Sequence, residues 1–496
     1  MELYKHIPFL SIMLPLVMAA FMLPVRKKGI ARTIVLAMSV LICALSVYLF
    51  VTLNALSQSF TYSMGHFPAP WGNELKAGPL ESLMAAVFAF VVFACVLAVD
   101  KKDEEKRGNN KSKVYYIIAG LLISSLMALT YTNDMFTGYV FIEINTIVAC
   151  AIAVADEKKS TVLAAVKYLV MSVVGSGLFL LSVSILYSIT GHLLMEPMHN
   201  SISALVSSGR YHLPLIMTLA LFLISVSVKS ALFPFHAWLP DAHASAASSD
   251  AAMLAGVVLK GYLILLIKII YRVYGLANIA KLGILPVVSY FGLVCMIVAS
   301  VLAIRQKDLK RLLAFSTIAQ IGYVYVGIGM GTMFGLAAAC FHMIAHSVGK
   351  SMLLMSAGVM KNEEGSSLIK RLAGVIKKQK LAGLAFFLGA LSMIGIPVLP
   401  GFASKFFLAL SSMQSKEHVI LSMIVLALST FLNAAYYLPA LVTLLSGKKE
   451  GAGESVKQYH ADSGMSVALL CLILINMLIG ICCVPIYTAI QNGLSL

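Results

Sequence analysis

The sequence has few charged residues for its length, and this scarcity excludes a soluble fold. Charged residues make up 12% of the 496 positions, whereas 60% are hydrophobic. A soluble globule of this size needs more polar side chains than that to cover its surface. The chain is therefore expected to lie in a membrane.

Motifs for phosphate, metal and iron–sulfur chemistry are also missing. The chain has no GxxxxGK[ST] phosphate-binding loop, so it is not expected to hydrolyse ATP. Its eight cysteines form no CxxC pair and all fall in apolar stretches, where cysteine acts as a small hydrophobic residue. We expect no cofactor, no metal and no catalytic centre of its own. Any electron transfer would belong to another subunit.

Long apolar stretches recur along almost the whole chain. A run of roughly 20 apolar residues is long enough to cross the ~30 Å hydrocarbon core of a bilayer. Continuous apolarity favours helices, because barrel strands alternate in polarity every second residue. The predicted fold is an all-α bundle of about fourteen membrane helices. The expected spans are 7-24, 33-53, 81-99, 114-131, 135-155, 161-190, 213-238, 250-273, 284-304, 311-331, 334-359, 381-411, 419-445 and 465-487.

Lysine and arginine gather in every second loop. They follow the odd-numbered spans, as at Arg26, Lys102 and Arg305, whereas the loop 191–212 has Arg210 as its only lysine or arginine. Because such bases collect in cytoplasmic loops, both termini are expected to lie outside. The net charge of +16 is spread over these loops, which suits anionic lipid headgroups and excludes nucleic acid as a partner.

The polar segments between the spans are short. Segments 54–80, 191–212 and 446–464 are too short to fold as separate domains, so one membrane domain is expected. Within the first of them, the stretch from Phe60 to Gly72 is rich in aromatic residues, proline and glycine. We expect a small external hairpin there.

Charged residues inside the apolar stretches are the main functional signal. A lone charge at the bilayer centre costs at least ~2.5 to 3.5 kcal/mol, so it is retained mainly where ions are handled. Glu143 has no base within four positions; it is expected to exchange protons or to bias a lysine, and a structural buried acid is the alternative. Lys229 lies in a span that Pro234 breaks, and broken helices are typical ion sites in transporters. A pair of Glu143 and Lys229 would hold or release a proton as their separation changes.

Two further lysines extend this pattern into the second half of the chain. Lys405 follows Pro397 in another broken span. Two proline-interrupted spans that each carry a lysine are what an internal repeat of about five helices leaves in a sequence. Lys260 is expected to link the two halves, and a base bound to a helix carbonyl is the alternative.

Histidines complete the set of candidate residues. His342, His346 and Lys350 recur every fourth residue and share one helix face over roughly 12 Å. Zinc binding is the weaker interpretation, because no HExxH acid or third ligand accompanies them. A proton wire fits better, since imidazole titrates near neutral pH. His236 and His243 follow Lys229 at the end of its span and either take up protons or anchor the loop.

Three segments resemble the antiporter-like subunits shared by Mrp-type sodium/proton antiporters, membrane-bound hydrogenases and respiratory complex I. They are 229–243 (KSALFPFHAWLPDAH), 306–322 (QKDLKRLLAFSTIAQIG) and 341–350 (FHMIAHSVGK). The resemblance implies two inverted five-helix repeats, each with a broken helix and half of a proton path. The implied divisions are 1-113 (helices 1–3 with the hairpin), 114-273 (helices 4–8), 284-445 (helices 9–13) and 446-496 (helix 14).

The resemblance also implies roles for single residues. Glu143 and Lys229 resemble the family's helix-five glutamate and helix-seven lysine. Lys260 and Lys405 resemble its bases on helices eight and twelve. The start of helix three, at Gly78 to Glu81, departs from the family pattern. The other matches are the polar stripe of helix eleven (His342, His346, Lys350) and a motif expected to pack loops (Asp308, Lys310, Arg311).

The expected function is proton translocation within a multisubunit membrane complex. The chain looks most like the D-type component of an Mrp-type antiporter or the hydrogenase equivalent. The alternative is a proton-pumping membrane subunit of a complex I-type NADH:quinone oxidoreductase; a stand-alone solute carrier and a structural anchor are two further classes. Expected partners are a second antiporter-like subunit, small membrane subunits, lipid, H⁺ and, for an antiporter, Na⁺. The expected location is a prokaryotic cytoplasmic membrane.

Overall fold

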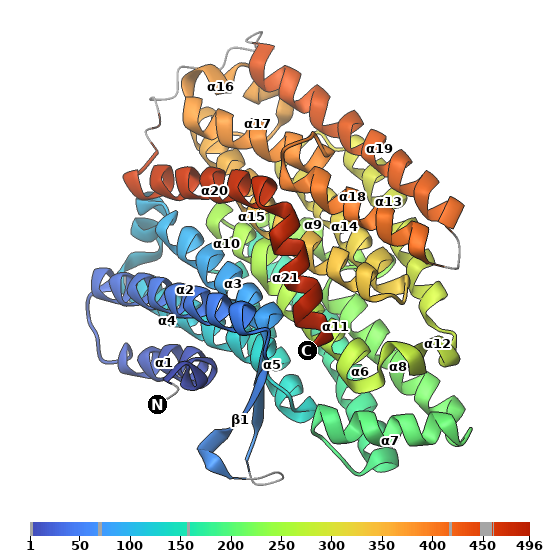
Figure 1. The fold of residues 1–496 in the computed structure, drawn as a ribbon. Helices are drawn as coiled ribbons and strands as arrows, with labels where there is room; N and C mark the ends of the chain where they lie inside the picture. The colour runs from blue at the N-terminus through green and yellow to red at the C-terminus, as the bar shows by residue number, and fades with distance from the viewer. Residues whose placement is uncertain (1–2, 68–71, 156–158, 416–418, 447–458, 460) are drawn as a thin grey trace.

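The computed structural model describes residues 3–67, 72–155, 159–415, 419–446, 459 and 461–496. Nearly all of its elements are helices, packed into one bundle (Figure 1). Twelve helices within the described ranges are long and apolar enough to cross a membrane. This confirms the predicted all-α multi-pass bundle, while the count of fourteen spans stays a prediction.

The N-terminal part contains four long helices and the predicted hairpin. Strand β1 pairs antiparallel with β2, with Phe60 opposite Ala77. The second strand therefore lies beyond Gly72, where the predicted hairpin ended. Helix α4 contains a kink at Gly108, where φ is 76°. The elements are η1 (Leu3–His6), α1 (Ile7–Phe21), α2 (Lys28–Leu56), β1 (Phe60–Ser63), η2 (Met64–His66), β2 (Glu74–Ala77), α3 (Pro79–Leu97) and α4 (Lys101–Tyr131).

The middle part contains the first broken helix. The predicted span 213-238 is not continuous, because α8 ends at Lys229 and the helical path resumes only at η3. Two segments, η4 and η5, are π-helical. The elements are α5 (Met135–Ala153), α6 (Lys159–Thr190), α7 (Met195–Ser207), α8 (His212–Lys229), η3 (Phe235–Ala237), α9 (Trp238–Ser245), α10 (Ser248–Met253), η4 (Leu254–Val258), α11 (Leu259–Lys268), η5 (Ile269–Tyr274) and α12 (Leu276–Leu282).

The last part contains the second broken helix. The predicted span 381-411 is divided into α17 and α18 around Pro397, and the predicted span 465-487 is divided at Cys482. The elements are α13 (Leu285–Ile304), α14 (Leu309–Gly329), α15 (Met333–Glu364), η6 (Ile369–Leu372), α16 (Val375–Lys378), α17 (Lys380–Ile394), α18 (Pro400–Gln414), α19 (Val419–Ser446), α20 (Ser463–Ile481) and α21 (Cys483–Ser495).

Burial separates central from peripheral helices. The most apolar window of the segment Ser248–Tyr274 is completely buried and that of α14 is 94% buried, whereas that of α2 is 28% buried. Peripheral helices expose large apolar side chains such as Ile424 and Phe431, as expected for surfaces in contact with lipid. The core of the bundle therefore runs through α10, α11, α14 and α15. Burying a polar side chain costs the most free energy there.

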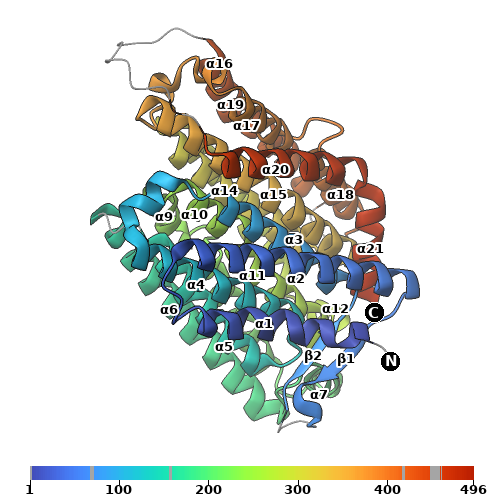
Figure 2. The same cartoon turned by 90° about the vertical axis from the view of Figure 1, so that its left-hand side faces the viewer.

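Both termini lie beside the hairpin (Figure 2). The rings of Tyr4 and Phe60 are 5.8 Å apart, and the Ser59 hydroxyl donates to the carbonyl of Leu496 at 3.1 Å. We call this side of the bundle the hairpin end. The opposite side, where α2 and α4 begin, is the basic end. Both described chain ends thus lie at this end of the bundle, and the prediction that the termini lie outside the cell stays a prediction.

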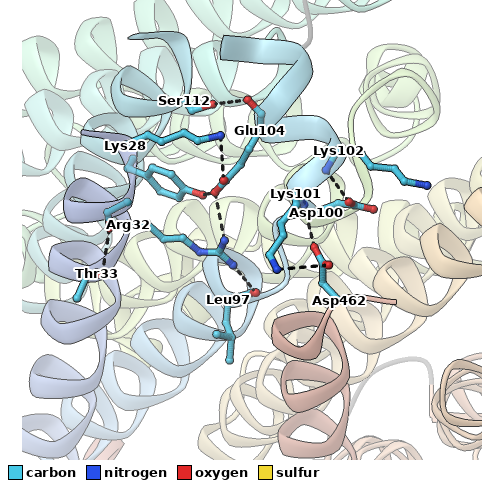
Figure 3. Close-up of polar contacts among 12 residues, drawn as sticks. Lys28, Arg32, Thr33, Leu97, Asp100, Lys101, Lys102, Glu104, Ser112 and Asp462 are labelled. Carbon is cyan, nitrogen blue, oxygen red and sulfur yellow. Dashed lines mark hydrogen bonds and ion pairs between the residues drawn. The ribbon is translucent and has the colours of Figure 1, made fainter. Parts of the chain in front are cut away.

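Charge pairs link three helices at the basic end (Figure 3). Glu104 of α4 forms ion pairs with Lys28 at 3.3 Å and with Arg32 at 3.2 Å, both on α2. The backbone N–H of Lys101 donates to Asp462, next to α20, at 2.9 Å. Near this cluster, burial and a hydrogen bond to Asp100 raise the pKa of the Tyr459 phenol. These contacts fix the N-terminal helices against the C-terminal ones.

Candidate functional site

Lys229 is the last residue of α8 and is completely buried. Its ammonium donates to the Thr146 hydroxyl on α5 at 2.9 Å. Gly175 on α6 makes room for this side chain, because a Cβ there would lie 3.1 Å from the Lys229 Cγ. A lysine at a helix end can extend its ammonium to the membrane surface. Although α8 ends at Lys229, before Pro234, the side chain is completely buried and does not reach that surface.

Glu143 lies on α5, half-buried, one turn before Thr146. It is within electrostatic range of Lys229. No ion pair within 4.0 Å joins the two among the described contacts; the Thr146 hydroxyl receives the ammonium instead. The predicted pair is thus electrostatic rather than direct. Such a pair can still favour a protonated lysine when the glutamate is charged.

Lys260 occupies the centre of the buried segment and follows the π-helical η4. Its ammonium donates to the carbonyl of Ala255, which is the contact expected of a structural base bound to a helix carbonyl. Lys260 is also within electrostatic range of Lys350 and His346 on α15. The structure therefore contains both features, the carbonyl contact and the position between the two halves.

The polar stripe of α15 faces inward along its whole length. The rings of His342 and His346 lie 6.1 Å apart and are nearly parallel. Within the described residues, both ring nitrogens of His346 and Nε2 of His342 have no hydrogen-bond partner. Buried polar atoms of this kind are usually satisfied by internal water. Lys350 donates to Ser316 at 2.9 Å and to Tyr437 at 3.2 Å.

Lys405 lies on α18, after the second break. Its ammonium donates to the carbonyls of Met393 and Ile394, at the end of α17, at 2.9 and 2.8 Å. A cation at a helix C-terminus is favoured by the helix dipole. Lys405 is within electrostatic range of His342, whose Nδ1 lies 3.0 Å from the Ser404 hydroxyl. The break at Pro397 thus brings the terminal lysine to the end of the stripe.

His236 and His243 differ in their surroundings. His236 is half-buried and packs against Phe233 with tilted rings, whose centroids are 5.3 Å apart. His243 is completely buried within electrostatic range of Lys260 and Lys350, and neither ring nitrogen has a partner in the described part of the chain. The structure brings His243 to the central row and leaves His236 at its margin.

The motif at the start of α14 connects loops. Asp308 caps the helix by accepting the Arg311 N–H at 3.0 Å, and it also bonds Ser367. The Arg311 guanidinium pairs with Asp241 of α9 at 2.6 Å. Lys310 donates to the carbonyl of Ala246 at 2.7 Å. These contacts support the expected role in loop packing.

Sequence reasoning missed several polar residues of the core. Tyr262 bonds Thr146 at 3.0 Å, and Lys268 is completely buried against backbone carbonyls at the end of α4. Arg107 and Asp250 form a buried ion pair at 2.8 Å. Lys268 was detectable, since it lies within the predicted span 250-273. No group of three metal-ligating side chains occurs among the described residues.

Comparison with known proteins shows the family of this chain. Residues 132–432 match the family described as "NADH:quinone oxidoreductase/Mrp antiporter, TM". The matched region covers both broken helices and the row between them. The chain belongs to this family of antiporter-like membrane subunits, and the resemblance drawn from the three sequence segments is confirmed.

Particular relatives come from two kinds of complex. The chain is 30% identical to the N-type component of the NADH-quinone oxidoreductase of Desulforudis audaxviator, covering 87% of this chain and 85% of the relative. It is 25% identical to the D-type component of the Na(+)/H(+) antiporter of Alkalihalophilus pseudofirmus, covering 84% and 82%. Both relatives are named as subunits, which supports other membrane subunits as partners.

Solved structures have the same fold. A chain of the archaeal membrane-bound sulfane sulfur reductase, a respiratory membrane complex, matches with a TM-score of 0.85 at 25% identity, over 99% of this chain and 97% of that one. A chain of the Mrp complex from Dietzia sp. matches with a TM-score of 0.87 at 17% identity, over 100% and 97%. Because its sequence identity is only 17%, the second match supports the fold alone.

Proposed function

We propose that this chain is a proton-translocating subunit of a multisubunit membrane complex of the Mrp antiporter type. The observation that carries the proposal is one row of titratable side chains through the buried centre. The row begins at Glu143 and Lys229, passes Lys260 and the α15 stripe, and ends at Lys405. A structural anchor has no need of so many costly buried groups.

The geometry supports transfer by charge coupling between neighbours. The imidazoles of His342 and His346 are 6.1 Å apart. Two unit charges at that distance repel by about 2.7 kcal/mol at an effective dielectric of about 20. Such an energy corresponds to roughly a hundredfold change in occupancy. A proton that arrives at one group therefore drives the next group to release its own.

The two ends of the row have different roles in this proposal. Lys229 exchanges a proton under the influence of Glu143, and His243 takes up protons from the basic end. Lys405 is the terminal group. The basic end faces the cytoplasm of a prokaryotic cell, the termini lie outside, and a second antiporter-like subunit and small membrane subunits complete the complex. The division into 114-273 and 284-445 then gives each half one broken helix and one terminal lysine.

A second candidate function is favoured by the relative at 30% identity. Because that relative is a subunit of a NADH-quinone oxidoreductase, a proton-pumping subunit of a redox-driven complex is the alternative. Copurified polypeptides distinguish the two. Iron–sulfur or nickel–iron subunits select the redox complex, and further antiporter subunits with Na⁺-dependent proton movement select the antiporter.

The test uses the assembled complex in everted membrane vesicles. Glu143→Ala and Lys229→Ala should each reduce proton translocation at least tenfold, measured with a pH-sensitive dye. Lys307→Ala is the matched control, since Lys307 is exposed at the basic end and should leave the rate unchanged. Assembled complexes of both variants that translocate protons at the unmodified rate would contradict the proposal.

A further inference from the structure

A polar pocket opens at the hairpin end, away from the central row. Its volume is about 260 Å³. It lies between the hairpin, α7 and η5, at a place where none of the predicted site residues is found. Burial lowers the pKa of Lys76 on its wall, and the nearby Arg272 lowers it further. The polar side chains that line it are Lys76, Asn133, Glu196, His199, Tyr271 and Arg272.

The floor of the pocket is a buried ion pair. Arg272 of η5 pairs with Glu81 of α3 at 2.7 Å, and their side chains are 7% and 0% exposed. The Tyr271 hydroxyl donates to the same carboxylate at 3.1 Å. Nε and Nη1 of Arg272 and Oδ1 of Asn133 have no partner in the described part of the chain. Unsatisfied donors and an acceptor thus belong to two residues that line the pocket, and the pocket is large enough for water.

Lys268 lies close to this floor. It is completely buried, and its ammonium donates to the carbonyl of Thr130 at 2.9 Å, at the end of α4. It is within electrostatic range of Arg272 and Glu81. Arg272 belongs to the π-helical η5, and Lys268 directly precedes it. Turns of π-helix occur often at functional sites.

Polar groups continue from Lys268 toward the first half of the central row. Asn145 accepts from the Ser125 hydroxyl at 3.3 Å, and it is next to Thr146, which holds Lys229. Ser125 and Thr130 lie on the same helix, α4, separated by roughly 7.5 Å along its axis. Both are buried. Helix α4 therefore connects two places: Ser125, which contacts Asn145 near Lys229, and the backbone carbonyl of Thr130, which contacts Lys268.

We propose that this pocket is a proton mouth, through which the first half of the row exchanges protons with water at the hairpin end. The inference rests on the proposed function. A proton on the Lys268 ammonium passes to the Glu81 carboxylate and then to water in the pocket. Arg272 stays charged, since guanidinium does not release its proton in proteins, and it keeps its ion pair with the Glu81 carboxylate at 2.7 Å.

Blocking the pocket tests the proposal. Glu196 is exposed on the pocket wall, and Ser207 is exposed at the far end of the same helix, α7. Glu196→Cys and the control Ser207→Cys are each treated with a membrane-impermeant sulfonate methanethiosulfonate in the assembled complex, with the reagent on the hairpin side. Mass spectrometry verifies modification. The unsubstituted chain, treated in the same way, accounts for the eight native cysteines.

The expected result is a decrease in proton translocation of at least fivefold for modified Glu196→Cys, relative to the same variant untreated. Modified Ser207→Cys should change by less than 1.5-fold. A modified Glu196→Cys complex with an unchanged rate overturns the proposal, and so does failure of the reagent to reach that cysteine. Either failure leaves the proposed function intact if Lys229→Ala still abolishes translocation.

Discussion

Replacing Thr146 with valine isolates the contact that holds Lys229. Valine has nearly the same shape as threonine, so it preserves packing on α5 and removes only the hydroxyl. That hydroxyl lies 2.9 Å from the ammonium of Lys229 and 3.0 Å from the Tyr262 hydroxyl. A hydrogen bond to a charged group contributes about 1.5 to 3 kcal/mol. Its loss should therefore shift the occupancy of the protonated lysine by roughly 10- to 150-fold.

The assay is proton translocation by the assembled Thr146→Val complex in everted vesicles, expressed per complex. We expect a decrease of at least tenfold, because the buried ammonium loses its partner and the protonated state becomes unfavourable. Thr137→Val on the same helix is the control, since it is the backbone N–H of Thr137 that bonds Asp134. If Thr146→Val assembles and translocates at the unmodified rate, Lys229 is not part of the path in the way described.

Three further predictions concern stability and transfer. Asp250→Asn removes the carboxylate charge that pairs with the buried Arg107 at 2.8 Å, and breaking a buried pair costs about 3 to 5 kcal/mol; the thermal midpoint of the purified complex should fall, and an unchanged midpoint would contradict this. Gly401→Ala places a Cβ 1.7 Å from the carbonyl oxygen of Ser392, so gel filtration should show failed assembly rather than intact complex. Asp308→Ala removes the α14 cap and should cost about 1 kcal/mol, with less assembled complex but an unchanged rate per complex.

The sequence predicted the membrane bundle and most of the central row, for a physical reason. A charged residue within an apolar stretch is visible by contrast with its neighbours, as Glu143, Lys229 and Lys260 are. The proline-interrupted spans likewise indicated both breaks. The roles of these residues stay predictions, although the structure places Lys229 near Glu143 and Lys260 near the α15 stripe.

The missed features depend on contacts between distant segments. At the end of α8, the Trp238 indole N–H donates to the carbonyl of Val228 at 3.1 Å, and no local sequence pattern indicates that contact. Helix α7 forms in a segment that looked like a polar loop. The pair of Arg272 and Glu81 joins η5 to α3, which lie far apart in the sequence, and spacing along the chain cannot indicate such a partner.

Lys260 provides the most direct test of the central claim, because it lies between the two halves of the row. The measurement is proton translocation by the assembled Lys260→Met complex, whose side chain keeps much of the lysine's length without its charge. If the proton path is continuous, the translocation rate should fall to the background measured in vesicles without the complex. An assembled Lys260→Met complex that translocates protons at the unmodified rate would show that protons do not cross the centre along this row.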